Sequence, residues 1–176
     1  MTIVVPDDYP SVLTGTAAEL QLRGLDRDVR IYTERGADRE DELSRRVADA
    51  ECVVNIRAHA HFTERVLDAC PNLRLISVWG SGTDHVDLDA CARRGIVVAS
   101  TPGVNAHAVA ELVMGLVVAA DRRIVDAASD LRAGRWQKGR YAEAPGLYGR
   151  RFGIAGLGAT GREVLARARA FGLVPS

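Results

Sequence analysis

Short apolar runs alternate with amphipathic segments along the first hundred residues. The runs are uninterrupted and rich in β-branched residues, as strands buried in a parallel sheet are, and they lie at residues 2–5, 29–33, 52–56, 73–79 and 96–100. Between them, apolar residues recur at helical spacing at residues 11–22, 39–50, 63–70 and 87–94. This alternation predicts an α/β domain over residues 1–100, with a flavodoxin-like parallel sheet covered by helices on both faces.

The pattern changes after residue 100. Pro102 and Gly103 break the chain, and Asn105 is placed to cap a helix that is predicted to run unbroken over residues 106–131. Its apolar stripe comprises Val109, Leu112, Val113, Leu116, Val117, Ala120, Ile124, Ala128 and Leu131. Met114 and Val118 add apolar surface on another side, so the helix needs more than one neighbour. A glycine-rich, irregular arm over residues 133–150 follows.

Residues 151–176 resemble the opening of a dinucleotide-binding unit. A predicted strand (152–155) and a predicted helix (161–170) flank a G-x-G-x-x-G turn, whose glycines are Gly156, Gly158 and Gly161. In this context the turn and the N–H groups of the helix start favour a bound pyrophosphate; a glycine turn without a ligand is the alternative.

The acidic residue that contacts the ribose in this motif is expected about 20 residues further on. Only "LVPS" follows Gly172, so no carboxylate is expected there. Strand 151–155 is likewise expected to lack a hydrogen-bonded partner from its own sheet. We therefore expect residues 151–176 to be either a remnant packed on the long helix or half of a site that another polypeptide completes.

Composition narrows the class of protein. Basic and acidic residues balance at 23 each, which gives no indication of nucleic acid or a membrane surface as a partner. The three cysteines are far apart, and no signal peptide or membrane span is apparent, which favours a cytoplasmic location. His59 and His61 alternate on a predicted loop and have no acidic or thiol partner nearby in the sequence, so no metal site is expected from the four histidines, which also include His85 and His107.

The segment "GSGTDHVDLDACARRGIVVASTPGVNAHAVAELVMGLVVAADRRI", followed by "GRW" and "GLGATGREV", resembles the D-isomer-specific 2-hydroxyacid dehydrogenases. The family includes phosphoglycerate, glyoxylate/hydroxypyruvate and D-lactate dehydrogenases. The resemblance covers nearly the whole chain and is most specific from Gly80 to Gly172. It implies that residues 1–100 form the substrate domain and that residues 101–176 begin a Rossmann domain for NAD, with NADP not excluded.

The resemblance also implies roles for particular residues. Ser81, Gly82 and Thr83 belong to the loop whose backbone N–H groups hold the substrate carboxylate, although a simple glycine turn would have the same residues. Arg57 matches a position facing the cleft, with a surface ion pair as the alternative, and the "AHAH" after it departs from the Ser-x-Thr common there. Asn105 matches an asparagine at the domain junction. The cofactor residues implied are Gly156, Gly158, Ala159, Thr160 and Gly161.

Activity is the remaining expectation. In the family, helix 105–131 and the arm around Trp136 form a homodimer, and an Arg, a Glu and a His beyond the glycine turn carry out hydride transfer with a small 2-hydroxy or 2-keto acid. None of these three can be assigned here. The chain is therefore expected to be a truncated member that is inactive alone; a non-enzymatic dimerisation or anion-binding module derived from the family is the alternative.

Overall fold

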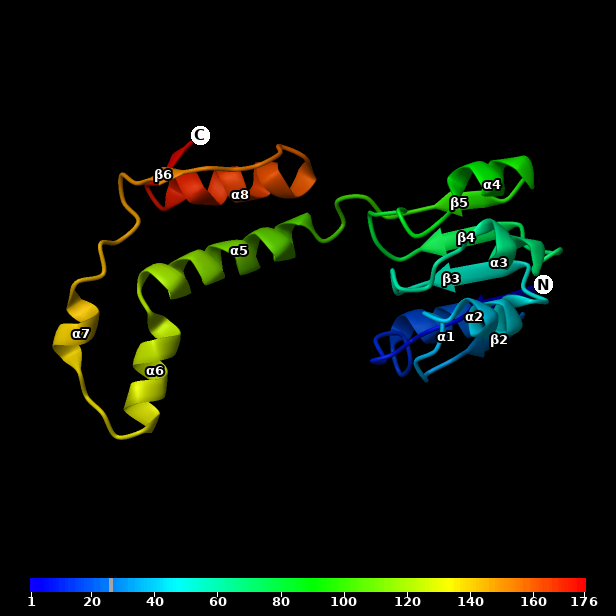
Figure 1. The fold of residues 1–176 in the computed structure, drawn as a ribbon, viewed down its shortest axis with the longest axis horizontal. Coiled ribbons are helices and arrows are strands. Elements are labelled where there is room, and N and C mark those ends of the chain that lie inside the picture. Colours follow the sequence, from blue (N-terminus) through cyan, green and yellow to red (C-terminus); the bar gives the residue numbers. More distant parts are fainter. Residues whose placement is uncertain (26) are drawn as a thin grey trace. The chain divides into compact units, whose positions relative to one another are not determined.

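A computed structural model describes residues 1–25 and 27–176 of the chain (Figure 1). The chain divides into two compact units, residues 1–102 and residues 103–176. Within the described residues, no helix has both the length and the apolar character needed to cross a membrane.

The first unit is built on a five-stranded, wholly parallel sheet, as the alternating pattern predicts. Its strand order is β2-β1-β3-β4-β5. The strands are β1 (Thr2–Val5), β2 (Asp28–Ile31), β3 (Cys52–Asn55), β4 (Leu75–Val78) and β5 (Val97–Ala99). The connecting helices are α1 (Ala17–Arg23), α2 (Glu40–Val47), α3 (Glu64–Asp68) and α4 (Leu88–Arg93). The predicted α/β fold with a flavodoxin-like parallel sheet is confirmed.

The two faces of this sheet are covered unequally. Helices α2, α3 and α4 pack side by side on one face, and the main hydrophobic core, which includes Val53, Phe62 and Ile76, lies beneath them. On the other face, α1 approaches Val54 and Ser77 and buries none of its own residues. Because side chains alternate along a strand, the fully buried residues of β3 and β4 point to the first face.

The segment before α1 is a turn rather than the first part of a helix. The carboxylate of Asp8 accepts hydrogen bonds from the backbone N–H groups of Val12, Leu13 and Thr14 and from the Thr14 hydroxyl. The Asp8 side chain thus takes the N–H groups of residues 12–14 in place of helical hydrogen bonds and holds these residues in a turn. The helix predicted from residue 11 therefore begins only at Ala17. Burial of Asp8 opposes its charge, yet these hydrogen bonds together keep its pKa below the usual value.

The second unit corrects the prediction of one unbroken helix. Its elements are α5 (Ala106–Asp121), α6 (Ile124–Arg132), α7 (Lys138–Ala142), β6 (Arg151–Phe152), α8 (Ala159–Ala170) and β7 (Val174–Pro175). The helix breaks at Arg123, which has a φ of 51° in the left-handed region. The apolar spacing continues across this residue, so periodicity alone does not detect the break. Arg123 instead pairs with Asp126, one turn into α6.

The apolar face that α5 buries also differs from the predicted stripe. Ala106, Ala110 and Met114 are its buried residues, whereas Leu112 and Leu116 of the stripe are 62% and 60% exposed. Small residues allow α5 and α8 to approach closely, and Met114 packs with Ala168 of α8.

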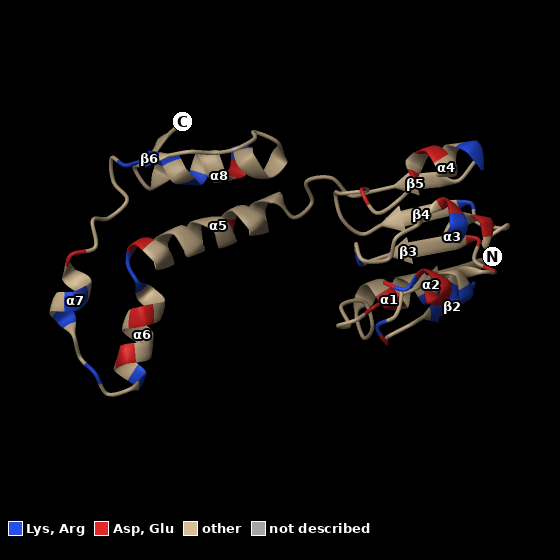
Figure 2. Ribbon diagram, viewed as in Figure 1, with Lys and Arg blue, Asp and Glu red and all other residues tan. Residues whose placement is uncertain are grey.

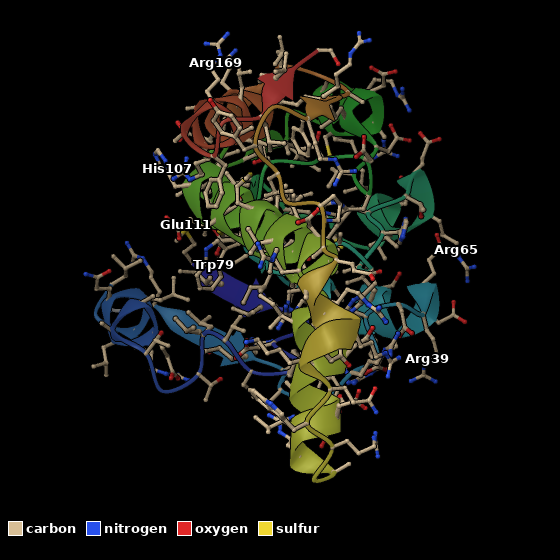
Figure 3. All side chains as sticks on the ribbon, turned by 90° about the vertical axis from the view of Figure 1, so that its left-hand side faces the viewer. Arg39, Arg65, Trp79, His107, Glu111 and Arg169 are labelled. Atoms are coloured by element: carbon tan, nitrogen blue, oxygen red, sulfur yellow. The ribbon has the colours of Figure 1, made fainter. Side chains whose placement is uncertain are left out.

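Ion pairs flank the contact between α5 and α8. His107 and Glu111 lie one turn apart on the same side of α5 (Figure 3). His107 is 3.0 Å from the carboxylate of Glu163, and Glu111 is 3.6 Å from the guanidinium of Arg167, both on α8. His107 and Glu111 are exposed, so these pairs are expected to contribute little to the stability of the contact.

The strand before the glycine turn has a partner, contrary to expectation. β6 pairs in parallel with β7, so Arg151 lies opposite Val174 and Phe152 opposite Pro175. Gly172, with a φ of +71°, turns the chain after α8 and directs the following residues back along β6. The pairing extends beyond the two strands, because the Ile154 N–H donates to the Ser176 carbonyl at 3.1 Å. The four residues after Gly172 are therefore enough to begin a second strand.

Candidate functional site

The carboxyl ends of β3 and β4 continue into two loops, residues 56–62 and 79–87, that are tied to each other. The Phe62 N–H donates to the His85 carbonyl at 2.8 Å, and the Asp87 N–H donates to the Phe62 carbonyl at 3.0 Å. Asp87 also caps α4 by accepting from the Ala90 N–H at 2.8 Å. Ligands of open α/β sheets bind at this edge, so the fold places the predicted substrate loop where a site is expected.

The loop from Gly80 to Thr83 presents its backbone to solvent. The Gly80 carbonyl accepts from the Thr101 N–H at 2.8 Å, and the Thr83 carbonyl accepts from the Val86 N–H at 2.9 Å, which fixes both ends of the loop. Between them, Ser81 and Gly82 are exposed and Thr83 is half-buried. The N–H groups of Gly82 and Thr83 have no acceptor among the described residues. Successive unpaired N–H groups of this kind form a concavity that suits an anion.

Arg57 follows β3 and lies in a second hollow at the same edge. Its Nη2 donates to the Pro10 carbonyl, and its Nε is buried without a partner among the described residues. No ion pair to Arg57 is found within the described part of the chain, so the surface ion-pair interpretation is not supported. The hollow has a volume of about 290 Å³ and is lined by Tyr9, Pro10, Arg35, Arg57 and His59.

A buried carboxylate orients His59 in this hollow. The Nε2 of His59 is 3.0 Å from the Oδ2 of Asp7, a residue that is only 1% exposed. Asp7 also accepts from the Tyr9 N–H at 3.1 Å. The sequence interpretation found no acidic partner for His59 because it searched nearby residues, and Asp7 is 52 residues away. A signal for this pair was available, because Asp7 follows β1 and His59 follows β3. These two strands are neighbours at the point where the strand order of the sheet reverses, so the residues after them are expected to lie close together.

The other histidines are distributed over both units. His61 and His85 line a cavity between β3 and β4, whereas His107 belongs to α5. Burial, followed by the nearby charge of His61, lowers the pKa of His85 below its usual 6.5. Within the described residues, no three side chains of His, Cys, Asp or Glu are grouped closely enough to hold a metal ion.

In the second unit, the glycine turn has the backbone geometry that the motif requires. Gly156 has a φ of +92°, which favours glycine, and Gly158 stands at the N-cap of α8 with open space where a Cβ would lie. A Cβ on Gly161 would be 2.1 Å from the Gly156 carbonyl oxygen, so only glycine allows the helix to pack this close to the turn. Ala159 and Thr160 form the first turn of α8, whose N–H groups lack intrahelical partners.

Asn105 occupies the expected N-cap position of α5, but its side chain makes no capping hydrogen bond. Its φ of −103° and ψ of 8° lie outside the extended region that a capping residue usually adopts. The prediction of simple capping is therefore wrong. The Asn105 carbonyl nevertheless accepts the first helical hydrogen bond, from the Val109 N–H at 2.9 Å.

Sequence comparison assigns the chain to a family. The model of the D-isomer specific 2-hydroxyacid dehydrogenase catalytic domain matches residues 11–170. The chain belongs to this family. The resemblance carried by the loop after β4 and by the glycine turn is thereby confirmed.

The sequence of the chain is also similar to those of individual dehydrogenases and reductases. The chain is 37% identical to D-3-phosphoglycerate dehydrogenase of Methanocaldococcus jannaschii over 134 residues, which is 76% of this chain and 25% of that protein. It is also 37% identical over 134 residues to hydroxypyruvate reductase of Thermotoga maritima, covering 76% of this chain and 43% of that protein. The chain thus spans less than half the length of these relatives.

The fold is shared with the crystal structure of the TT0316 protein from Thermus thermophilus. The TM-score is 0.88 at 31% identity, over 99% of this chain and 55% of that one. The fold described here therefore also occurs in that structure, where it takes up about half of a longer chain. Of the predicted site residues, the structure brings Arg57 and the loop 81–83 to one edge of the first unit, and it groups residues 156–161 in the second.

Proposed function

We propose that the chain provides the substrate domain and the first part of the cofactor domain of an NAD-dependent D-2-hydroxyacid dehydrogenase. The enzyme would act on the CH–OH group of a small D-2-hydroxy acid. The observation that carries this proposal is the 2.1 Å separation between the Gly156 oxygen and a Cβ built on Gly161, because close packing of the helix on the turn is the role of the third glycine in the dinucleotide motif. Family membership supports it.

The substrate carboxylate would be held by the backbone N–H groups of the loop Ser81–Thr83. The exposed backbone of Gly82 admits an anion closely, since a Cβ there would meet nothing nearer than the Asp84 carboxylate at 3.5 Å. Arg57 would supply positive charge at the same sheet edge, and Asn105 is a further substrate residue by its match to the family. A titration with glycolate, followed by the amide resonances of residues 80–84, tests this role. Unchanged resonances at millimolar glycolate would refute it.

The residues present fit a nicotinamide dinucleotide. Gly158 leaves space at the helix start, and the N–H groups of Ala159, Thr160 and Gly161 together with the helix dipole suit a diphosphate. The dinucleotide, when bound, would accept or supply the hydride of the reaction. NAD and NADP share this diphosphate, so the turn serves either one. We expect a dissociation constant above about 1 mM for NADH, because the ribose contact of the motif has no counterpart here.

The 176 residues alone are proposed not to catalyse hydride transfer. In the family the substrate-polarising Arg, the Glu and the His follow the glycine turn, and loss of a general acid/base alone costs about 10²–10⁴-fold in rate. The assay is NADH oxidation by the purified chain with glyoxylate or hydroxypyruvate. Measurable turnover would refute this part of the proposal; glycolate and NADH binding without turnover would support it.

The second unit is proposed to form a homodimer. Helix α5 carries almost no charge along its length (Figure 2), and Leu112, Leu116, Leu131 and Trp136 are exposed, Trp136 by 77%. A further apolar hollow of about 510 Å³ lies between α6 and α7 and is lined partly by Ile124 and Tyr141. Large exposed apolar side chains gathered on one unit are typical of an interface.

Sedimentation of the wild type and of a Leu116→Asp variant tests the homodimer. The variant is expected to be monomeric, and a monomeric wild type would refute the proposal. The small substrate and the buried free cysteines fit a cytoplasmic enzyme.

A further inference from the structure

The first residue of α8 is in contact with a glycine that lies outside the glycine turn. A Cβ built on Gly103 would be 3.3 Å from the Cβ of Ala159, where α8 begins. Gly103 itself lies in the turn that leads into α5, and its carbonyl accepts from the Ala106 N–H at 3.0 Å. The start of α5 is therefore packed against the start of the helix that is proposed to receive the diphosphate.

This contact is the first of a row along two helices that lie side by side (Figure 1). The buried residues of α5 are Ala106, Ala110 and Met114, which follow Gly103 at intervals of three and four residues and so share one side of the helix. Met114 packs with Ala168, in the last turn of α8. Because the row begins at the first turn of both helices, α5 sets the position of α8 along its whole length.

The first turn of α8 has little support from buried side chains. Both buried residues of this helix, Val164 and Ala168, lie beyond its first turn. Among the described residues, two close contacts of glycines hold that turn: Gly161 packs on the glycine turn, and Gly103 packs on Ala159. The second contact comes from a segment far away in the sequence, so the motif alone does not fix where α8 begins.

The same first turn carries the groups that would bind the diphosphate. Helical hydrogen bonding begins with the Arg162 N–H, which donates to the Gly158 carbonyl at 3.0 Å, so the N–H groups of residues 159–161 have no helical acceptor. A binding site must hold such groups within about 0.5 Å of the geometry that the ligand requires. A side chain at position 103 would displace Ala159 by a few tenths of an ångström, because 3.3 Å is shorter than the 3.4–4 Å of ordinary contacts.

We infer that Gly103 is a positioning residue for the diphosphate turn. Its lack of a side chain sets where Ala159 lies, and thereby where the N–H groups of residues 159–161 point. The inference rests on the proposed function, since it requires that the turn binds a diphosphate. The alternative is that glycine serves only the φ of +76° at position 103, a left-handed conformation that side chains disfavour.

Pyrophosphate binding to the full chain tests the inference. Binding is followed by the amide resonances of residues 156–161, and stability by the midpoint of thermal unfolding. Gly146→Ala is the matched control for Gly103→Ala, because Gly146 is also half-buried, has a φ of +78° and would place its Cβ in open space. Both variants are expected to lower the midpoint through backbone strain. Only Gly103→Ala should weaken pyrophosphate binding, by about two- to fivefold.

Two more variants separate the contact from the strain. Asparagine tolerates the left-handed conformation better than alanine and has the same Cβ, so Gly103→Asn should lower the midpoint less while weakening pyrophosphate binding at least as much. Ala159→Gly removes the Cβ that a side chain at position 103 would meet. Adding Gly103→Ala to Ala159→Gly should therefore cause no further loss of pyrophosphate affinity, although the midpoint should still fall.

The outcomes separate this inference from the proposed function. Equal pyrophosphate affinity in the wild type, Gly103→Ala and Gly103→Asn would overturn the inference and leave the diphosphate turn intact. A loss of affinity that Gly146→Ala shares, or that persists without the Ala159 Cβ, would also overturn it, because the loss would not come through Ala159. If pyrophosphate shifts none of residues 156–161 in the wild type, the proposed cofactor role of the turn is refuted and the inference with it.

Discussion

Replacing Gly161 with alanine tests the packing on which the cofactor turn depends. The added Cβ would lie 2.1 Å from the Gly156 carbonyl oxygen and 3.1 Å from its carbon, whereas ordinary contacts are 3.4–4 Å. The obstacle is backbone, so it cannot rotate away. Alanine gains about 1 kcal/mol over glycine inside a helix, and overpacking costs about 1–3 kcal/mol. Because the clash exceeds an ångström, we expect a net destabilisation of about 1–2 kcal/mol.

The assay must report on the second unit alone. Amide hydrogen exchange provides this, because peptides from α8 and from the five-stranded sheet can be followed separately. Gly161→Ala should increase exchange in residues 151–176 and leave exchange of the sheet unchanged. An alanine at Gly161 that leaves exchange as in the wild type would show that the turn and helix do not pack this closely in solution, and the dinucleotide interpretation would lose its main support.

Gly158→Ala is the matched control. Its backbone is extended, with a φ of −69° and a ψ of −164°, and a Cβ there would meet nothing within 4 Å. The stability cost should stay below about 1 kcal/mol, the usual difference between glycine and alanine at an N-cap. The methyl group would nevertheless occupy the space proposed for a diphosphate, so NADH-induced shifts of residues 156–161 should weaken. Wild-type shifts in this variant would place the diphosphate elsewhere.

Three further predictions concern ionisable groups. Asp130 is buried and accepts hydrogen bonds from Arg135, Arg140 and Tyr141. Asp130→Asn removes the negative charge that holds these side chains, so limited proteolysis should cleave residues 124–142 faster than in the wild type. An unchanged cleavage rate would contradict this prediction. The pKa of Asp8 is lower in the folded chain than its usual value of 3.8, so ionised Asp8 stabilises the folded state. This stabilisation is fully present above pH 3.8 and is lost as the pH falls through the pKa of the folded state. Asp8→Asn should therefore cost about 2–3 kcal/mol at pH 7, by urea unfolding, and progressively less below pH 4; a pH-independent difference would refute the assignment. Burial raises the pKa of the Cys70 thiol to about 11, so a thiol reagent should label it only after unfolding.

The sequence predicts the first unit well because its pattern is repetitive and local. Each of the five strands follows from a short apolar run, and Thr63 and Asp87 cap the helices that follow them through side-chain hydrogen bonds. The glycine turn is equally local, since Gly156, Gly158 and Gly161 act on their own backbone. Errors at the ends of helices arise where a side chain competes for the backbone, as Asp8 does before α1.

The features that the sequence did not predict depend on contacts between distant residues. The Asp7–His59 pair joins the ends of two neighbouring strands, and the partner of β6 lies beyond an intervening helix. The break at Arg123 is invisible to periodicity because alanine, valine and leucine continue on both sides of it. The buried face of α5 was likewise misjudged, because small residues such as Ala106 and Ala110 carry the contact while larger ones remain exposed.

The buried polar residues at the carboxyl edge of the sheet fall into two groups, which differ in whether their side chains are hydrogen-bonded. Asp8 and Asp7 are fully buried, but each accepts several hydrogen bonds from its own loops, so their charges serve the fold. Asn55 and His85 are nearly as buried and leave ring or amide atoms unpaired. A buried amide without a partner costs the fold free energy, so replacing Asn55 with leucine, which has a similar volume, is expected to raise the midpoint of thermal unfolding. A variant that is less stable than the wild type would show that the Asn55 amide serves the fold and would place it in the first group.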